Sequence, residues 1–232
     1  MECIILAGGL GTRLAGVIGA LPKCMAPVAG KPFLHHLFDY LAAQGCQRAI
    51  LSLGFRHEQV LEWLEQHNWP FAIDYVIEEA PLGTGGGIAL AIHKAADNDV
   101  IVINGDTMFA VDLADMLLYH RLQQASATLA LKEMFAFDRY GVVRTGEDGH
   151  ISSFEEKQYR EQGLINGGIY ILNKEQLQAK QLPERFSFEK DYLEKYVGEH
   201  QFYGFQSDSY FIDIGVPEDY NKAQEDFGLK TQ

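Results

Sequence analysis

The sequence predicts an α/β fold, a three-layer sandwich around a mixed, mostly parallel central sheet. Three observations support this prediction. In the first half of the chain, short β-branched runs alternate with segments of helical period, which is typical of strands joined by helices. Beyond about residue 125 strand signals outnumber helix signals, which predicts a mixed second half. The sequence has no repeat, low-complexity tract or Pro/Ser linker, so we expect one continuous domain over residues 1–232.

The first half is predicted to alternate strictly between strands and helices. The predicted strands are Cys3–Ala7, Ala49–Leu53, Ile73–Ile77 and Val100–Asn104. Apolar residues at helical spacing predict helices at Lys31–Gln44, His57–His67, Ile88–Ala96 and Leu113–Gln124, and Gly45 ends the first of them.

The second half is predicted to be richer in strands. These are Ala127–Leu131, Gly141–Arg144, Ile151–Glu155, Gly168–Leu172, Gln201–Gln206 and Tyr210–Ile212. Helices are predicted at Leu177–Lys180, Phe188–Val197 and Pro217–Phe227.

Composition narrows the range of partners. The formal net charge of −13 repels nucleic acid and anionic membranes, so we expect neither as a partner. A phosphate-bearing ligand would then need a local cationic pocket or a bound metal. Cys3, Cys24 and Cys46 form no C-x-x-C pair, and the chain shows no signal peptide and no apolar run of membrane-spanning length. We therefore expect a cytoplasmic protein without a thiolate zinc site.

A glycine-rich loop follows the first predicted strand. Gly8, Gly9 and Gly11 allow backbone N–H groups to approach a phosphate, and Thr12 and Arg13 add a hydroxyl and a positive charge. The dinucleotide fingerprint fails because Leu14 replaces its third glycine, and no Walker lysine follows. The loop is predicted to be an anion cradle, and a plain strand-to-helix turn is the alternative.

Lys23 lies between two prolines in the segment that follows. Pro22 and Pro27 restrict the backbone, so the Lys23 ammonium is predicted to be held in one direction, as suits a phosphate. The alternative is that Lys23 and Lys31 are solvated loop charges.

Two aspartates end apolar strands. Asp106 follows the strand at Val100–Asn104, at the sheet edge where ligands of open α/β folds bind, and Asp213 follows Tyr210–Ile212. Two converging carboxylates would hold Mg²⁺, a hard cation that takes oxygen ligands. Asx turns that have only a structural role are the alternative.

A Glu–Lys pair follows the strand at Ile151–Glu155. Glu156 is predicted to bind a sugar hydroxyl and Lys157 a phosphate if the pair is buried, and the pair is a solvated surface if it is exposed. The eight histidines form no H-E-x-x-H motif, and no serine lies in a nucleophile elbow, so neither a zinc enzyme nor a serine hydrolase is supported.

In order along the chain, these segments resemble the sugar-1-phosphate nucleotidyltransferases. The matching pieces are the glycine loop, Pro22-Lys23, Pro81-Leu-Gly-Thr-Gly85, Gly105-Asp106, Tyr140-Gly-Val142, Glu155-Glu-Lys157, Asn166-Gly-Gly168 and Asp213-Ile-Gly215. Within the family the chain is most similar to the D-glycero-α-D-manno-heptose 1-phosphate guanylyltransferases, through Phe137-Asp-Arg-Tyr-Gly141, Gly163–Tyr170 and Tyr210–Tyr220. The resemblance implies a Rossmann-like sheet, and relatives commonly form homodimers.

The resemblance also implies a reaction. A sugar 1-phosphate, whose second pKa is ~6, is largely a dianion and needs no general base. It attacks the α-phosphorus of a nucleoside triphosphate in line and releases pyrophosphate, so catalysis consists of alignment and charge neutralisation. By resemblance, Arg13 holds the β- and γ-phosphates, Lys23 stabilises the α-phosphate, and Asp106 and Asp213 carry Mg²⁺.

The remaining site residues fall into two groups by resemblance. The nucleotide is expected to contact Leu6, Ala7, Gly8, Gly9, Gly11, Thr12, Arg13, Glu78, Pro81, Gly83, Thr84, Asn104 and Gly105, all in the part at about residues 1–125. The sugar phosphate is expected to contact Tyr140, Gly141, Glu156, Lys157 and Asn166, in the part at about residues 126–225.

The sequence indicates the nucleotide base and the sugar less directly than it indicates the reaction. A carboxylate at Glu78 would accept both guanine donors, N1–H and N2–H, which favours GTP, although Glu78 could also end a strand in solvent. The alternatives are a mannose 1-phosphate guanylyltransferase, an N-acetylmuramate 1-phosphate uridylyltransferase, or a non-catalytic regulator that binds a nucleotide sugar. The chain lacks the prolines that many relatives carry near Ala15 or Gly16 and at Cys24, which weakens any transfer of base specificity.

Overall fold

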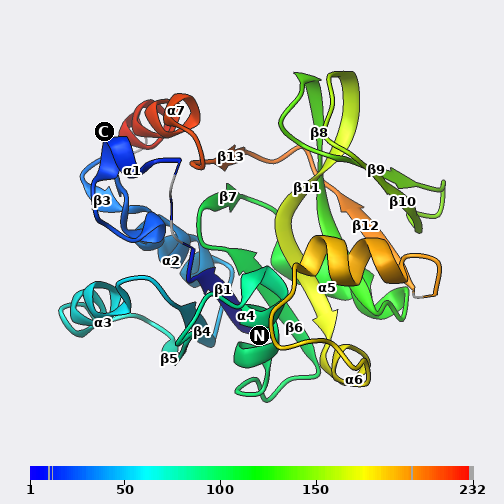
Figure 1. The fold of residues 1–232 in the computed structure, drawn as a ribbon, viewed down its shortest axis with the longest axis horizontal. Coiled ribbons are helices and arrows are strands. Elements are labelled where there is room, and N and C mark those ends of the chain that lie inside the picture. Colours follow the sequence, from blue (N-terminus) through cyan, green and yellow to red (C-terminus); the bar gives the residue numbers. More distant parts are fainter. Residues whose placement is uncertain (10, 12, 200, 230–232) are drawn as a thin grey trace.

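A computed structural model of the protein describes residues 1–9, 11, 13–199 and 201–229. Within these ranges nine strands form one central sheet (Figure 1). The strands along its main path are β10 (Ile151–Glu155), β9 (Val142–Thr145), β11 (Arg160–Asn173), β6 (Asp99–Asn104), β1 (Glu2–Ala7), β4 (Arg48–Leu53) and β5 (Ala72–Ile77). Strand β8 (Ala127–Phe137) pairs with β11, and β12 (Phe202–Gln206) pairs with β8.

The strand directions confirm the predicted mixed, mostly parallel sheet. Strand β1 runs parallel to β4 and β6, β4 runs parallel to β5, and β8 runs parallel to β12. Strand β11 is antiparallel to β6, β8 and β9, and β10 is antiparallel to β9. Among the described strands of this sheet, therefore, only β10 and β11 run against the common direction.

Helices cover both faces of the sheet, which confirms three layers. One core contains Cys3 and Ile5 of β1 and the apolar faces of α1 (Ala15–Ile18), α2 (Phe33–Ala43), α3 (His57–Glu65), α5 (Leu113–Leu122) and α7 (Pro217–Gly228). The other contains Ile4 and faces α4 (Gly83–Ile92), α6 (Lys174–Gln178) and the π-helix η2 (Phe188–Glu194). Successive β1 side chains alternate between the two cores, as a strand requires. None of the described helices is long and apolar enough to cross a membrane.

Two small two-stranded sheets and one short helix lie outside the central sheet. Strand β7 (Thr107–Phe109) pairs with β13 (Phe211–Asp213), and β2 (Pro27–Val28) pairs with β3 (Lys31–Pro32). The 3₁₀ helix η1 (Lys23–Met25) precedes β2. The C-terminal helix α7 lies beside these early segments (Figure 1), and the Gln224 side chain accepts a hydrogen bond from the Ala29 backbone N–H at 2.8 Å.

Three predicted elements were wrong in extent. Helix α4 begins at Gly83 and ends at Ile92, whereas the prediction was Ile88–Ala96. Its glycines have low helix propensity, but tertiary contact compensates, because the 184–186 segment lies directly against them. Strands β8 and β11 extend well beyond their predicted ends, since polar residues along them, such as Glu133 and Gln162, pair across the strands at 2.6 Å.

Replacing Gly86 by Ala is expected to destabilise the fold. A Cβ atom at Gly86 would lie 2.5 Å from the Glu184 carbonyl oxygen, so the backbone at 184–186 would have to move. We expect a loss of about 1 to 3 kcal/mol in the free energy of unfolding, measured by urea denaturation. Gly198→Ala is the matched control, because nothing lies within 4 Å of its Cβ position. Equal stability of the two variants would contradict this packing.

Candidate active site

The carboxyl ends of β1 and β6 form the floor of the site. Leu6 is the register partner of Asn104, and the Gly105 N–H donates to the Leu6 carbonyl at 2.9 Å. A Cβ at Gly105 would lie 2.5 Å from that oxygen, so a glycine is needed for this close approach. The glycine loop after β1 and the Gly105-Asp106 turn therefore lie next to each other.

The pairing of β7 with β13 brings the two aspartates together. Thr107 is the register partner of Asp213, and the Ile214 N–H donates to the Asp106 carbonyl at 3.0 Å. The Lys23 ammonium, held at the start of η1, lies between the two side chains. It donates to Asp106 Oδ2, and its Nζ lies 3.9 Å from Asp213 Oδ1. Lys23 is therefore directed at the carboxylates and is only 13% exposed, which argues against a solvated loop charge.

This cluster contains two carboxylates and one lysine ammonium, so its negative charge can accept a further cation. Burial, together with the nearby Asp106 carboxylate, raises the pKa of Asp213, and Lys23 opposes that rise. The Gly215 N–H also donates to Asp213 Oδ1 at 2.7 Å and fixes its orientation. The two carboxylates share one buried ammonium, so their oxygen donors suit a hard divalent ion. Among the described residues, no group of three or more His, Cys, Asp or Glu is placed so that it could hold a metal ion, so substrate oxygens and water would have to complete the coordination.

A cavity of about 330 Å³ lies on one side of this cluster, over β1 and α4. Most of the residues predicted to bind the nucleotide line it. They are Leu6, Ala7, Gly8, Gly9, Glu78, Pro81, Gly83, Thr84, Asn104 and Gly105, and Lys23, Cys24 and Asp106 complete the wall. We call this the smaller cavity.

Glu78 is held inside the smaller cavity. Its backbone N–H donates to the Leu53 carbonyl at 2.7 Å and so continues the β5 pairing. Its carboxylate accepts hydrogen bonds from Ser52 Oγ at 3.0 Å and from the Leu82 N–H at 3.1 Å. The Glu78 carboxylate also lies against Gly8, where a Cβ would come within 2.5 Å of Oε1. Glu78 therefore does not simply end a strand in solvent.

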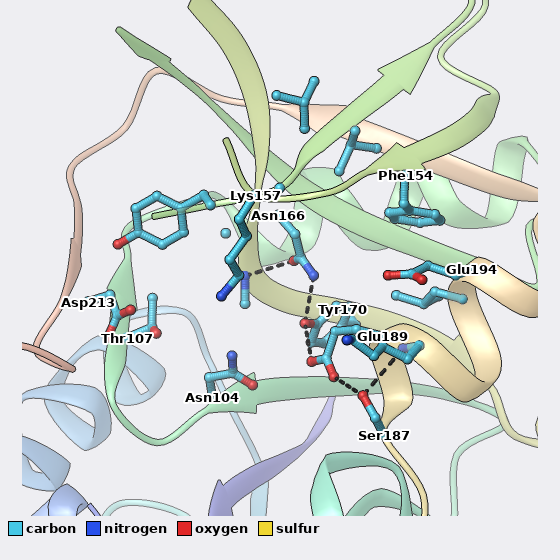
Figure 2. Close-up of a pocket in the computed structure, with 18 of the residues that line it drawn as sticks. Asn104, Thr107, Phe154, Lys157, Asn166, Tyr170, Ser187, Glu189, Glu194 and Asp213 are labelled. Carbon is cyan, nitrogen blue, oxygen red and sulfur yellow. Dashed lines mark hydrogen bonds between the residues drawn. The ribbon is translucent and has the colours of Figure 1, made fainter. Parts of the chain in front are cut away.

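A larger cavity of about 420 Å³ lies on the other side of the aspartates (Figure 2). All five residues predicted to bind the sugar phosphate line it: Tyr140, Gly141, Glu156, Lys157 and Asn166. Asp213 and Arg13 also line it. Asn104 and Asp106 line both cavities, so the two cavities meet at the carboxylate cluster.

Hydrogen bonds and ring contacts orient the walls of the larger cavity. Asn166 Nδ2 donates to the Tyr170 hydroxyl at 2.8 Å, and the Gly168 N–H donates to Asn166 Oδ1 at 3.0 Å, where β11 departs from regular pairing. The Tyr140 ring packs edge-on against Phe211 at 6.1 Å. Glu156 and Lys157 follow β10 and line the cavity. Both are exposed, so the sequence-based expectation of a buried Glu–Lys pair is not met.

Two residues of the glycine loop depart from the expected grouping. Arg13 lines the larger cavity rather than the smaller one. Gly11 has a φ of +60° and packs against the Lys23 side chain, where a Cβ would lie 3.2 Å from the Lys23 Cβ. Thr12 lies outside the described residues.

Sequence reasoning missed one wall of the larger cavity. This wall consists of Ser187, Glu189, Lys190, Leu193 and Glu194 from η2 and its approach. Thr107, Phe154, Tyr170 and Phe211, which line other parts of the cavity, were missed as well. Only the apolar period of a helix was visible at 188–197. A local pattern gives no sign that this helix faces a pocket built mainly by residues far away in the chain.

Glu189 links the walls of the two cavities. Its Oε2 accepts hydrogen bonds from Thr84 Oγ1 at 2.8 Å and from Ser187 Oγ at 3.0 Å. Its Oε1 accepts one from the Tyr170 hydroxyl at 3.4 Å (Figure 2). Because Thr84 lines the smaller cavity and Tyr170 the larger one, this network fixes the two walls relative to each other.

Two cavities that meet at a carboxylate–lysine cluster suit the joining of two substrates. The sequence matches the profile of the nucleotidyl transferase family over residues 2–228, and the chain belongs to that family. It is 50% identical to D-glycero-alpha-D-manno-heptose 1-phosphate guanylyltransferase of Aneurinibacillus thermoaerophilus, over 97% of this chain and 98% of that protein. It is 45% identical to the protein of the same name from Campylobacter jejuni subsp. jejuni serotype O:2, over 95% of this chain and 97% of that protein.

A solved structure agrees with these relatives. The crystal structure of HddC from Yersinia pseudotuberculosis complexed with GMP-PN superposes with a TM-score of 0.89 at 40% identity. The superposition covers 97% of this chain and 99% of that one. The Rossmann-like expectation for the sheet is thereby confirmed.

Proposed function

We propose that this protein transfers GMP from GTP to D-glycero-α-D-manno-heptose 1-phosphate, giving GDP-heptose and pyrophosphate. The observation that carries the proposal is the meeting of the two cavities at Asp106, beside Lys23 and Asp213. Two substrates placed in them would present their phosphates to the same cluster. The names of the two relatives above and the GMP-PN complex of HddC support this choice of substrates.

The reaction then depends on alignment and on charge. The sugar phosphate is already a dianion near neutral pH, so no side chain has to remove a proton. One of its oxygens attacks the α-phosphorus, a new P–O bond forms, and the bond to the β-phosphate oxygen breaks and releases pyrophosphate. In this proposal Lys23 stabilises charge on the α-phosphate and Lys157 holds the sugar phosphate. Arg13 lines the larger cavity, close enough to Asp213 for its charge to act there, and would hold the outgoing phosphates from that side of the junction.

Asp106 and Asp213 would hold Mg²⁺ in this scheme. The ion would neutralise charge on the phosphate oxygens of the nucleotide and favour departure of pyrophosphate. The donor set fits this role. Two carboxylates share one ammonium, so the cluster has excess negative charge that a divalent cation would neutralise while it also binds substrate oxygens.

Glu78 is proposed to read guanine. Glu78 lines the smaller cavity, and each of its carboxylate oxygens accepts one hydrogen bond from the protein, which leaves further lone pairs for a base. Guanine offers two donors, N1–H and N2–H, where uracil and thymine offer one. Glu78→Gln replaces one acceptor by a donor while keeping the size. We expect it to lower kcat/KM for GTP by about 10- to 100-fold and to reduce the preference for GTP over UTP.

The matched control for Glu78 is Glu79→Gln, the exposed neighbour that does not line the cavity. Both variants are assayed by pyrophosphate release with each of the four nucleoside triphosphates. An unchanged base preference in Glu78→Gln would exclude the proposed role.

The decisive test of the function is an activity matrix. Purified protein is offered GTP, ATP, UTP and CTP, each with heptose 1-phosphate, mannose 1-phosphate and N-acetylmuramate 1-phosphate, and pyrophosphate is measured. We expect the highest kcat/KM for GTP with heptose 1-phosphate. A maximum at mannose or N-acetylmuramate 1-phosphate would favour those alternatives, and no turnover with any pair would favour a non-catalytic binder.

A further inference from the structure

The larger cavity has two chemically different ends. Figure 2 shows Asp213 and Thr107 at one end, Phe154 and Glu194 at the other, and Lys157 and Asn166 between them. A sugar 1-phosphate must place its phosphate at the aspartate end, where the cavities meet. The far end then receives a part of the sugar that is remote from the reacting phosphate.

The far end is built by the π-helix η2. Hydrogen bonds from residue i to i+5 place Glu189 and Glu194 one turn apart, and both line the cavity. Glu189 is occupied by Thr84, Ser187 and Tyr170. Glu194, by contrast, is exposed, and among the described residues no side-chain hydrogen bond or ion pair engages its carboxylate, which lies beside Phe154 in Figure 2.

The side chains of this end have the composition of a small sugar subsite. The half-buried Phe154 ring supplies apolar surface on which C–H groups of a sugar can pack, and the fully buried Leu193 supports this end from within the core. Glu194 supplies two acceptor oxygens and no donor, which suits hydroxyl groups. The exposed Lys190 lines the same cavity and partly balances the negative charge of the two glutamates.

We propose that Phe154 and Glu194 hold the exocyclic C6–C7 arm of the sugar, and that Glu194 determines specificity for a heptose over a hexose. This inference rests on the proposed function. In a manno-heptopyranose the C6–C7 arm extends farther from the phosphate than the ring hydroxyls do, and it carries two vicinal hydroxyls. Glu194 accepts hydrogen bonds from that diol. Mannose 1-phosphate has the same ring but lacks C7 and its hydroxyl, so it loses part of this contact.

The test compares the two sugar phosphates at saturating GTP. The quantity measured is the ratio of kcat/KM for heptose 1-phosphate to kcat/KM for mannose 1-phosphate. Glu194→Ala is expected to lower this ratio by about 10-fold or more, mainly through KM for the heptose, because hydrogen bonds to the arm are lost. Glu194→Gln keeps one acceptor oxygen and is expected to fall between the wild type and Ala. Glu199→Ala removes an exposed carboxylate of the same segment and should leave the ratio unchanged.

The outcomes separate this inference from the proposed function. If the wild type uses heptose 1-phosphate and GTP but Glu194→Ala keeps the wild-type ratio, or loses activity equally on both sugars, the subsite assignment is wrong and the function stands. If the wild type turns over no pair of substrates, the function itself fails. Calorimetric titration with GTP and thermal unfolding verify that the variants fold. Should Glu194→Ala not fold, Glu194→Gln and Phe154→Leu carry the same comparison, and a wild-type ratio in both overturns the proposal.

Discussion

Asp106→Asn is expected to lower kcat by about three orders of magnitude while the fold stays intact. The substitution keeps the size of the side chain but removes one of the two carboxylate charges at the junction of the cavities. A metal at a transferring phosphate supplies several kcal/mol of charge stabilisation, and each 1.4 kcal/mol corresponds to about tenfold in rate. The variant should also need a higher Mg²⁺ concentration for half-maximal activity, which a magnesium titration of pyrophosphate release measures.

The control for Asp106 is Asp208→Asn, which removes the same charge at an exposed position that lines neither cavity. Thermal unfolding of both variants shows whether the fold is retained. Asp213→Asn should resemble Asp106→Asn, and the double variant should lose little more, because residues that act as one unit are not additive. Wild-type turnover of Asp106→Asn would refute the metal assignment.

The predictable part of the site is the part that local sequence encodes. The glycine loop and Asp106 each follow an apolar β-branched strand, and parallel strands present their carboxyl ends at one edge. Asp106 and the loop could therefore be placed together from the sequence. Pro22 likewise signalled a fixed backbone at Lys23, which η1 supplies.

The remaining features depend on pairing between distant segments. Asp213 reaches Asp106 only because β13 pairs with β7, about a hundred residues earlier in the chain. The helical glycines of α4 were not predicted, since their low propensity is offset by a segment that lies far away in the sequence. Glu189 and Glu194 carry no local signal, because their role follows from where η2 packs.

The site also shows how a chain of formal charge −13 can attract two anions. Long-range repulsion is screened within about 10 Å at 0.1 M salt, so local charges decide binding. Arg13, Lys157 and Lys190 line the larger cavity, and Lys23 lines the smaller one. A metal at the aspartates would add positive charge where the substrate phosphates meet.

Lys23→Gln is expected to lower kcat by about 100- to 1,000-fold, with a smaller change in KM for GTP. The Lys23 ammonium lies between Asp106 and Asp213, at the point where the α-phosphate of a nucleotide in the smaller cavity would approach them. Its charge acts on a phosphate whose negative charge is redistributed during transfer, so the loss belongs to the transition state and appears in kcat. Steady-state kinetics with GTP and heptose 1-phosphate at saturating Mg²⁺ measure both constants.

Lys31→Gln provides the comparison, because Lys31 belongs to the same proline-rich segment but is 45% exposed and lines neither substrate cavity. It should retain wild-type kinetics. Lys23→Arg should rescue little, since Gly215 crowds the ammonium so closely that a Cβ there would lie 3.0 Å from Nζ, and the planar guanidinium is larger. If Lys23→Gln and Lys31→Gln lose activity equally, or if Lys23→Arg restores full turnover, then Lys23 contributes only general positive charge and has no directed role at the α-phosphate.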